Sequence, residues 1–471
     1  MRAESVQIEP KIKISLLEKI SYGCGDFASS MFWKLFSMYL LFFYTDIFGL
    51  PAAAVGTMFL VTRIWDAIND PMMGAIADRT NTRWGKFRPY LLFGSIPFAI
   101  IGIITFTTPN LSASGKLIYA YVTYTLMMMI YTVVNVPYSS LMGVITNDTN
   151  DRTSLASFRF IGAFSGGILV TVSANYLINY FSIGNNFSRG YQWTVGVYAI
   201  LAALFFILTF AGTKERLKPA KEKKSSLKND LTDLAHNKPW FIMLGAGISV
   251  LIFNSLRDGS ILYYFKYFIK SQEINLLGYK FYLTHSELSS AYMTIWLATN
   301  IIGVILAKPF SSKIGKKNTF LLSTISSAVF STLLYFLQPH QIILIFLLNI
   351  LIGISAGIVL PLIWSMYADI SDYSEWKSGR RATGLIFSSS SMSQKFGWTL
   401  GGALSGWILA AFGFQPNVEQ TDLSLIGIRL MISIIAAIGA ILATIFILFY
   451  PLSEDYMKKI ETELELARNN N

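Results

Sequence analysis

The chain contains very little cysteine and histidine. Its 471 residues include one cysteine, Cys24, and three histidines, His236, His285 and His340, which lie far apart in the sequence. One cysteine cannot form an intrachain disulfide or a thiolate metal site, and dispersed histidines do not indicate a metal-binding or catalytic cluster. The sequence also lacks the H-E-x-x-H, G-x-S-x-G and phosphate-loop motifs of common enzyme classes. We therefore expect neither an enzyme nor a bound cofactor.

Charged residues are also scarce, at 14% of the chain, whereas hydrophobic residues make up 53%. Apolar runs of about 20 residues recur from end to end, and each can cross the roughly 30 Å hydrocarbon core of a bilayer. A net charge of +11 would suit a nucleic-acid-binding protein, but the basic residues are spread over alternate loops, as in membrane proteins. The composition favours a polytopic protein of the lipid bilayer, without a nucleic acid partner.

The apolar runs predict an all-α membrane protein with twelve transmembrane helices. Their approximate limits are 21–48, 52–77, 90–107, 117–145, 155–180, 192–212, 240–268, 288–310, 319–338, 341–367, 384–413 and 425–450. Lysine and arginine are dense in the loops after the second, sixth, eighth and tenth spans and sparse after the first, third, fifth and ninth; Lys270 and Lys280 break the pattern. The positive-inside rule then places both termini in the cytoplasm, and the protein in a cytoplasmic (inner) membrane.

A long charged segment divides the chain into two halves. We expect an N-terminal six-helix bundle over 1–213, a basic cytoplasmic loop over 214–239, and a C-terminal six-helix bundle with a cytoplasmic tail over 240–471. A charged turn at 74–86 follows the second span, and a fainter copy at 312–317 follows the eighth. Two halves with a charged turn at the same place resemble the major facilitator fold.

Two acidic residues lie inside the second apolar run. Asp66 and Asp70 are four residues apart and share a helix face, with Asn69 beside them. An aspartate near the bilayer centre costs about 2.5–3.5 kcal/mol, so two close together need a physical reason. A buried ion pair with Arg63 would explain only one carboxylate. We predict that Asp66, Asp70 and Asn69 bind a coupling ion, either sodium or a proton.

The first and fourth spans carry polar residues that suit a carbohydrate. Asp26, Ser30 and Trp33 follow 0, +4, +7 spacing and share one face. A carboxylate accepts hydrogen bonds from hydroxyls, and an indole packs against the C–H face of a pyranose. In the fourth span, Asn135 and Tyr131 lie near a proline that bends the helix. The alternatives are an Asp and Trp at the membrane interface, and an asparagine that bridges two helices.

The second half has charged residues inside its spans as well. Lys395 lies about a dozen residues into the eleventh span, where a lysine is as costly as an aspartate. We expect it to face Asp66 and Asp70 from the opposite half, with snorkelling to a membrane surface as the alternative. For Arg257 and Asp258 in the seventh span, snorkelling toward the outer surface is favoured over mutual neutralisation.

Several of these motifs together resemble one transporter family, the glycoside–pentoside–hexuronide:cation symporters of the major facilitator superfamily, to which melibiose permease belongs. The motifs are Tyr22-Gly-x-Gly, Trp65-Asp66-Ala67-x-Asn69-Asp70-Pro71, Trp84-Gly-Lys-Phe-Arg-Pro89, Asp369-x-x-Asp372-Tyr373 and Lys395. The resemblance covers all predicted spans. It implies alternating access and import of a sugar or glycoside together with a sodium ion or proton.

The resemblance also assigns roles by position. Asp66 and Asp70 match the cation-site aspartates of the family, and Lys395 matches the lysine of its eleventh helix. Arg152 with Asp369 and Asp372 resembles the cytoplasmic contact that closes the two halves.

The chain departs from melibiose permease in the sugar pocket. Ser30 and Asn135 stand where that protein has aspartates, and Ser139 replaces a tryptophan. The expected substrate is therefore a pentoside, another oligosaccharide or a uronide, and no obligatory protein partner is evident. The rival function on the same fold is an uncoupled facilitator or a lysolipid transporter.

Overall fold

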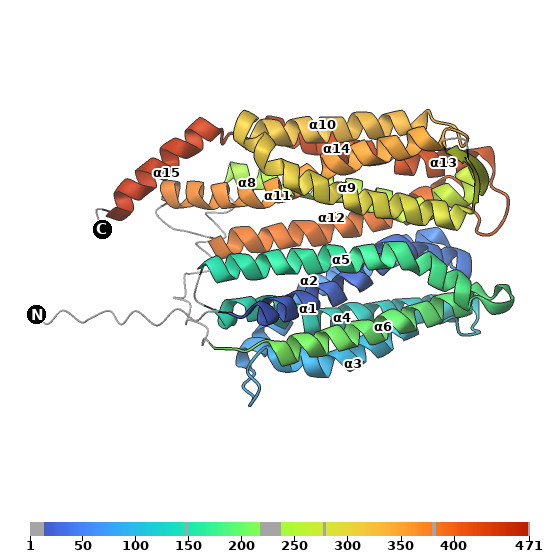
Figure 1. Ribbon diagram of the computed structural model, residues 1–471, viewed down its shortest axis with the longest axis horizontal. Coiled ribbons are helices and arrows are strands. Elements are labelled where there is room, and N and C mark those ends of the chain that lie inside the picture. The colour runs from blue at the N-terminus through green and yellow to red at the C-terminus, as the bar shows by residue number, and fades with distance from the viewer. Residues whose placement is uncertain (1–13, 147–148, 217–236, 277–278, 379–382, 470–471) are drawn as a thin grey trace, which may run out of the picture.

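The computed structural model describes residues 14–146, 149–216, 237–276, 279–378 and 383–469, and in these ranges it consists of helices and one small hairpin (Figure 1). The elements of the first half are α1 (Leu16–Leu35), the π-helical segments η1 (Phe36–Leu40) and η2 (Phe43–Ile47), α2 (Ala52–Arg79), α3 (Arg88–Thr105), α4 (Ala113–Ile145), α5 (Thr149–Phe181), the short η3 (Ile183–Asn185) and α6 (Phe187–Gly212). Those of the second half are α8 (Lys238–Tyr263), η4 (Tyr264–Ile269), strands β1 (Gln272–Leu276) and β2 (Tyr279–Leu283), α9 (His285–Ile314), α10 (Lys316–Tyr335), α11 (Ile342–Ser378), α12 (Thr383–Ala411), α13 (Asp422–Ile432), α14 (Ile434–Leu448) and α15 (Glu454–Asn469).

Helices α1 to α6 form one bundle and α8 to α14 form a second bundle beside it (Figure 1). Within the first, α1 packs on α5 and α6, and α3 packs on α4 and α6; within the second, α9 packs on α11 and α8 packs on α12 and α14. The bundles meet where α2 contacts α12 and α5 contacts α9. We call the end with the β1–β2 hairpin and α13 the hairpin end, and the opposite end, with α15, the terminal end. The segment predicted as the middle loop lies largely outside the described residues, since 217–236 are not described.

Eight of the described helical segments are long and apolar enough to cross a membrane. They are Arg88–Thr105, Ala113–Ile145, Ser154–Phe181, Phe187–Gly212, Lys238–Ile269, His285–Ile314, Ile342–Lys377 and Asp422–Leu448. In α2, Ala52–Thr62 is a shorter apolar stretch. The multi-pass helical membrane class is thus confirmed, while the number of twelve spans stays a prediction.

Local sequence signals explain several helix limits. Ser112 precedes α4 and its side chain accepts a hydrogen bond from the Gly115 amide, which satisfies one of the free N–H groups of a helix start. Thr284 and Glu287 form a complete capping box at the start of α9. Gly315 separates α9 from α10 with φ +82°, a conformation that favours glycine because it has no side chain.

Glycine also sets the spacing where α2 and α12 cross. A Cβ atom on Gly406 of α12 would lie 2.4 Å from the carbonyl oxygen of Ala52 and 2.9 Å from the Cα of Gly56. No real side chain tolerates such contacts, so the two backbones touch directly. This crossing brings the two bundles together near the hairpin end.

The expectation for Arg257 and Asp258 was wrong. Arg257 of α8 is 1% exposed, and its guanidinium donates to the Tyr292 hydroxyl at 2.8 Å, to Asn349 Oδ1 at 3.2 Å and to the carbonyl oxygen of Ile432 at 3.1 Å. It therefore neither snorkels nor neutralises its neighbour. Instead, its two terminal nitrogens donate to acceptors from α9, α11 and α13 inside the second bundle, which no local pattern reveals.

Candidate functional site

An ion pair joins the two bundles at the predicted ion site. The Lys395 ammonium of α12 pairs with Oδ2 of Asp70 on α2. The other carboxylate oxygen of Asp70 accepts a hydrogen bond from the Thr132 hydroxyl of α4 at 3.0 Å. Three helices from both bundles thus converge on one carboxylate. Thr132 had not been singled out from the sequence, although it follows Tyr131 in a polar stretch of the fourth span.

The remaining members of the predicted ion site are partly described. Asn69 is 9% exposed, and its side-chain nitrogen has no hydrogen-bond partner among the described residues. The side chain of Asp66 lies outside the described residues. Carboxylate, amide and hydroxyl oxygens are the ligands that hard cations prefer, so Asp70, Asn69 and Thr132 fit a small cation. Among the described residues, no three His, Cys, Asp or Glu side chains gather as a metal site.

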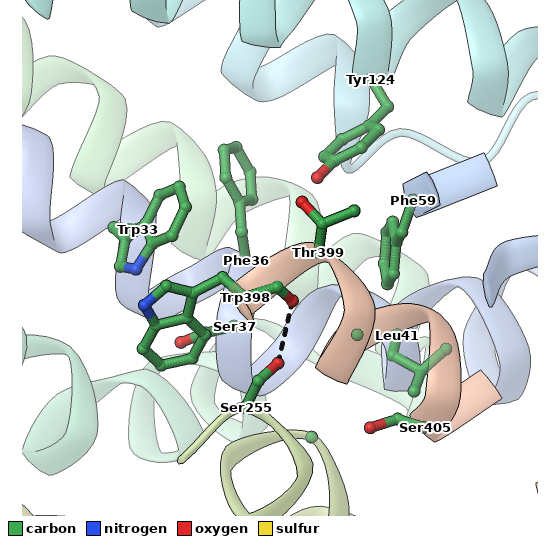
Figure 2. A pocket seen from close by; sticks show the side chains of 12 residues that line it. Trp33, Phe36, Ser37, Leu41, Phe59, Tyr124, Ser255, Trp398, Thr399 and Ser405 are labelled. Atoms are coloured by element: carbon green, nitrogen blue, oxygen red, sulfur yellow. Dashed lines mark hydrogen bonds between the residues drawn. The ribbon is translucent and has the colours of Figure 1, made fainter. Parts of the chain in front are cut away.

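A cavity lies between the bundles on the hairpin side of this ion pair. It is narrow and partly open to solvent. Its lining comes from both bundles: Trp33, Phe36, Ser37, Leu41, Phe59, Tyr124, Ser255, Gly259, Trp398, Thr399, Gly402 and Ser405. Figure 2 shows the indole rings of Trp33 and Trp398 side by side on one wall; they meet edge to face at 5.9 Å between centroids. Aromatic walls with a few polar groups are typical of pockets for small molecules.

The predicted sugar residues of the first and fourth spans fall into two groups. Trp33 lines the cavity, and the centroid of its ring lies 6.1 Å from that of the Tyr131 ring. The Tyr131 hydroxyl in turn accepts a hydrogen bond from Asn135 Nδ2 at 3.1 Å. These three side chains form one continuous group, and Ser30 lies half-buried one turn before Trp33.

Asp26 belongs to the second group. Arg159 of α5 donates to both of its carboxylate oxygens, from Nε at 2.5 Å and from a terminal nitrogen at 3.3 Å. The same guanidinium lies 5.0 Å from the ring centroid of Tyr138. The carboxylate therefore has a fixed basic partner, so any contact with a ligand would be made by the pair. The sequence signal for Arg159 was its position inside the fifth apolar run.

The residues of the predicted closing contact lie at the terminal end. Asp369 of α11 accepts from the Lys316 ammonium at 2.7 and 2.8 Å, and Asp372 is half-buried one turn later. The side chain of Arg152 lies outside the described residues, so its contact with these carboxylates remains a prediction.

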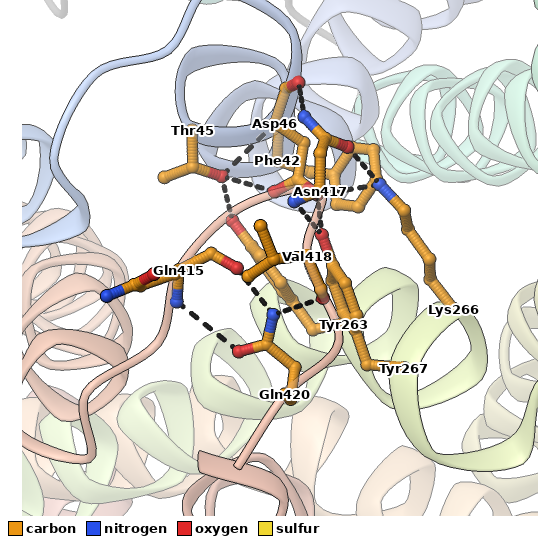
Figure 3. Close-up of polar contacts among 10 residues, drawn as sticks. All are labelled: Phe42, Thr45, Asp46, Tyr263, Lys266, Tyr267, Gln415, Asn417, Val418 and Gln420. Atoms are coloured by element: carbon orange, nitrogen blue, oxygen red, sulfur yellow. Dashed lines mark hydrogen bonds and ion pairs between the residues drawn. The ribbon is translucent and has the colours of Figure 1, made fainter.

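A polar cluster joins the bundles at the hairpin end (Figure 3). Asp46 of η2 accepts from the Lys266 ammonium at 2.8 Å and from the Tyr267 hydroxyl, both in η4. Asn417, in the loop before α13, donates to the Asp46 carbonyl oxygen and accepts from Lys266 at 2.7 Å. We call Asp46, Lys266, Tyr267 and Asn417 the hairpin-end cluster. None of its members was singled out from the sequence as a contact between the halves.

A second missed ion pair lies deeper, between Lys34 of α1 and Asp258 of α8, at 3.0 Å. Asp258 was expected to snorkel toward the outer surface or to be neutralised by the adjacent Arg257, whereas its partner comes from the other bundle. A lysine directly after Trp33, inside an apolar run, was the available signal.

Comparison with known proteins gives a consistent picture. A family model described as "MFS/sugar transport protein" matches residues 21–454. The inner membrane symporter YicJ of Escherichia coli is 38% identical, over 96% of this chain and 95% of its own length. The isoprimeverose transporter of Lactiplantibacillus pentosus is 36% identical, over 92% and 88%. Among solved structures, a bacterial homologue of the human drug peptide transporters PepT1 and PepT2 aligns with a TM-score of 0.66 at 10% identity, over 94% of this chain and 99% of that one.

Proposed function

The chain belongs to the MFS/sugar transport protein family, and on that basis we propose that it imports a sugar or glycoside in symport with a sodium ion or proton by alternating access. Its relatives are membrane transporters and not enzymes. They include a putative glycoside/cation symporter of Escherichia coli, which supports a coupling ion. The observation that carries the proposal is the pairing of Asp70 with Lys395 across the two bundles.

This pairing gives a physical route to coupling. A cation that binds Asp70, Asn69 and Thr132, together with Asp66, competes with the Lys395 ammonium for the same carboxylate. Displaced from Asp70, the ammonium becomes a donor for a sugar hydroxyl. Cation and sugar then each favour the same state of the protein, which is the thermodynamic requirement for coupling between two ligands.

The sugar would bind in and beside the cavity between the bundles. Trp33 offers an aromatic face, and Tyr131 with Asn135 offers hydrogen-bonding groups behind it. Ser30, and Asp26 held by Arg159, extend the polar surface toward the terminal end. This arrangement keeps every sugar residue predicted from the sequence as a candidate, with Asp26 acting as half of an ion pair.

We further propose that the terminal end faces the cytoplasm of a cell whose inner membrane holds the protein. The density of lysine and arginine in alternate loops supports this orientation. Arg152 with Asp369 and Asp372 would then close the cytoplasmic side when the hairpin end opens. The two six-helix halves would move as units around the cavity, as in other transporters built from repeats.

The names of two relatives indicate which class of substrate to test first. One is an isoprimeverose transporter and another a glucuronide carrier homolog of Escherichia coli at 30% identity. These names support a pentoside-containing oligosaccharide or a uronide as the first compounds to test.

The test uses purified protein in proteoliposomes, with labelled glycosides and with sodium and pH gradients imposed separately. We expect one gradient to stimulate uptake by about tenfold or more, in the range of typical coupling between two sites. Asp66→Asn and Asp70→Asn should each abolish this stimulation. Asp422→Asn, at an exposed acid at the hairpin end, should leave it unchanged and serves as the control.

Two results would contradict the proposal. Full cation stimulation of uptake in both Asp66→Asn and Asp70→Asn would show that these residues do not bind the coupling ion. Uptake by the wild type that ignores both gradients would instead favour the uncoupled facilitator or the lysolipid transporter.

A further inference from the structure

The ion pair between Lys34 and Asp258 is unusually well buried for one that connects two moving parts. The side chain of Asp258 is 1% exposed and that of Lys34 is 15% exposed. An ion pair removed from water gains little net stability unless its remaining donors and acceptors are also satisfied. The stability of this pair therefore depends on what its remaining donors and acceptors contact.

The remaining acceptor is not satisfied within the described part of the chain. Oδ2 of Asp258 accepts from Lys34, but Oδ1 is buried without a hydrogen-bond partner there. One turn earlier on the same face of α8, Oδ1 of Asn254 is likewise buried and without a partner among the described residues. Each such group costs about 1–3 kcal/mol relative to a satisfied one. Two on one helix face indicate a surface prepared for donors from outside the protein.

The pair adjoins the cavity described above. On α1, Trp33 precedes Lys34, and on α8, Ser255 and Gly259 flank Asp258; all three line the cavity. The Lys34 ammonium lies 6.0 Å from the ring centroid of Trp398, whose indole forms part of the wall in Figure 2. Lys34 and Asp258 do not line the cavity themselves, but residues next to each of them do, so the pair lies just behind the cavity wall.

A sugar hydroxyl matches this pair chemically. A hydroxyl accepts from an ammonium and donates to a carboxylate at the same time, so it can insert between Lys34 and Asp258 without leaving either unpaired. The indole faces of Trp33 and Trp398 would hold the C–H face of the same ring. A carboxylate ligand does not fit equally well, because it would displace Asp258 from Lys34 and leave a buried charge without compensation.

We propose that Lys34 and Asp258 form a clamp for one hydroxyl of an uncharged pyranoside, and that they select uncharged glycosides over uronides. The proposal rests on the proposed function, namely sugar transport through this cavity. Since each bundle supplies one member, a hydroxyl held by both residues ties recognition of the sugar to the approach of the two bundles.

The experiment is a cycle between protein variants and sugar analogues. Binding is measured by calorimetry for methyl xyloside, glucoside and galactoside and for their monodeoxy derivatives. For the wild type, we expect removal of one particular hydroxyl to weaken binding about 10- to 100-fold, the effect of hydrogen bonds to charged groups. In Lys34→Met/Asp258→Leu, removal of that hydroxyl should change binding less than about threefold.

The double variant removes both charges together, so no buried charge is left unpaired to prevent folding. Asp258→Asn provides a second, milder variant. In this variant, removal of the same hydroxyl should weaken binding less than it does in the wild type. The matched control is Asp46→Asn in the hairpin-end cluster, which also weakens an ion pair between the bundles but lies away from the cavity lining. It should shift the affinity of all analogues by one common factor.

Three outcomes decide. If the removal of each hydroxyl weakens binding by the same factor in the wild type and in the double variant, the clamp is overturned and sugar transport stands. If methyl glucuronide binds the wild type as tightly as methyl glucoside, the selection of uncharged glycosides is overturned. If the wild type binds none of the three methyl glycosides, the clamp is overturned; if it binds neither methyl glucuronide nor isoprimeverose either, the proposed function falls with it.

Discussion

At the scale of single residues, the molecule handles its membrane-embedded charges by pairing them over long sequence distances. Asp70 pairs with Lys395, Asp258 with Lys34, and Asp26 with Arg159. Charged groups in the apolar interior are tolerated only with such partners. Arg257 is the exception, because its charge is dispersed over neutral acceptors, the Tyr292 hydroxyl and the Asn349 amide among them.

Replacement of Arg257 should therefore act on stability and not directly on recognition. Arg257→Leu leaves Asn349 Oδ1 and the Ile432 carbonyl oxygen buried without their donors, and we expect the free energy of unfolding to fall by about 2–5 kcal/mol. Thermal unfolding in detergent checks this. Arg189→Leu, at an exposed arginine, is the control and should leave the midpoint unchanged; equal midpoints for the two variants would contradict the structural role.

At the scale of elements, the two halves repeat one device at a helix start. The Glu215 carboxylate, just after α6, accepts from the backbone amides of Lys86, Phe87 and Arg88 where α3 begins. Glu454, at the start of α15, accepts from the Lys316 amide where α10 begins. A carboxylate at a helix N-terminus satisfies free N–H groups and interacts favourably with the helix dipole. The charged turns seen in the sequence thus mark equivalent positions in the two halves.

The glycine crossing of α2 and α12 allows a second prediction. Gly406→Val inserts a side chain where the Ala52 carbonyl oxygen leaves no space, so it should hold the bundles apart at the hairpin end. We expect a cysteine introduced at Ser255, with Cys24 replaced by serine, to react faster with a membrane-impermeant thiol reagent. Gly74→Ala is the control on α2, since a Cβ there meets nothing within 4 Å; equal labelling rates in both variants would contradict the prediction.

At the scale of the whole molecule, the described polar contacts between the bundles concentrate toward the hairpin end. The hairpin-end cluster is one set. Another is Asn175 of α5, whose amide donates to the Ser286 carbonyl oxygen and to the hydroxyls of Ser289 and Ser290 on α9, at 2.9–3.0 Å. The structure therefore represents a state closed at that end. In an alternating-access cycle these contacts must break before a ligand can enter there.

Weakening the hairpin-end cluster should shift this equilibrium. Lys266→Met leaves the buried Asp46 carboxylate without its ammonium partner, which disfavours the closed state. With the Ser255 cysteine as reporter, we expect labelling to rise about fivefold or more, equivalent to roughly 1 kcal/mol. Lys280→Met disrupts the exposed pair with Glu273 on the hairpin, which contributes little. Labelling that rises equally in both variants would show that the cluster does not hold the closed state.

The membrane class and the position of Lys395 opposite Asp70 could be predicted from the sequence. Long apolar runs fix membrane helices because every backbone polar group in lipid needs a partner within its own segment. The spacing of Asp66, Asn69 and Asp70 fixes a shared helix face, since the helical period is local. The motifs that contain them carried the resemblance to sugar symporters, and the comparisons confirm the family.

Apart from Lys395, whose position opposite Asp70 was predicted, the partners of the buried charges were decided only by the tertiary structure. Nothing near Asp258 in the chain points to Lys34, 224 residues away, and nothing near Asp26 points to Arg159. Sequence periodicity orients a side chain around its own helix, but which helix lies opposite depends on how the two bundles pack. The sequence thus determines which residues are charged, whereas the packing of the bundles determines which group compensates each charge.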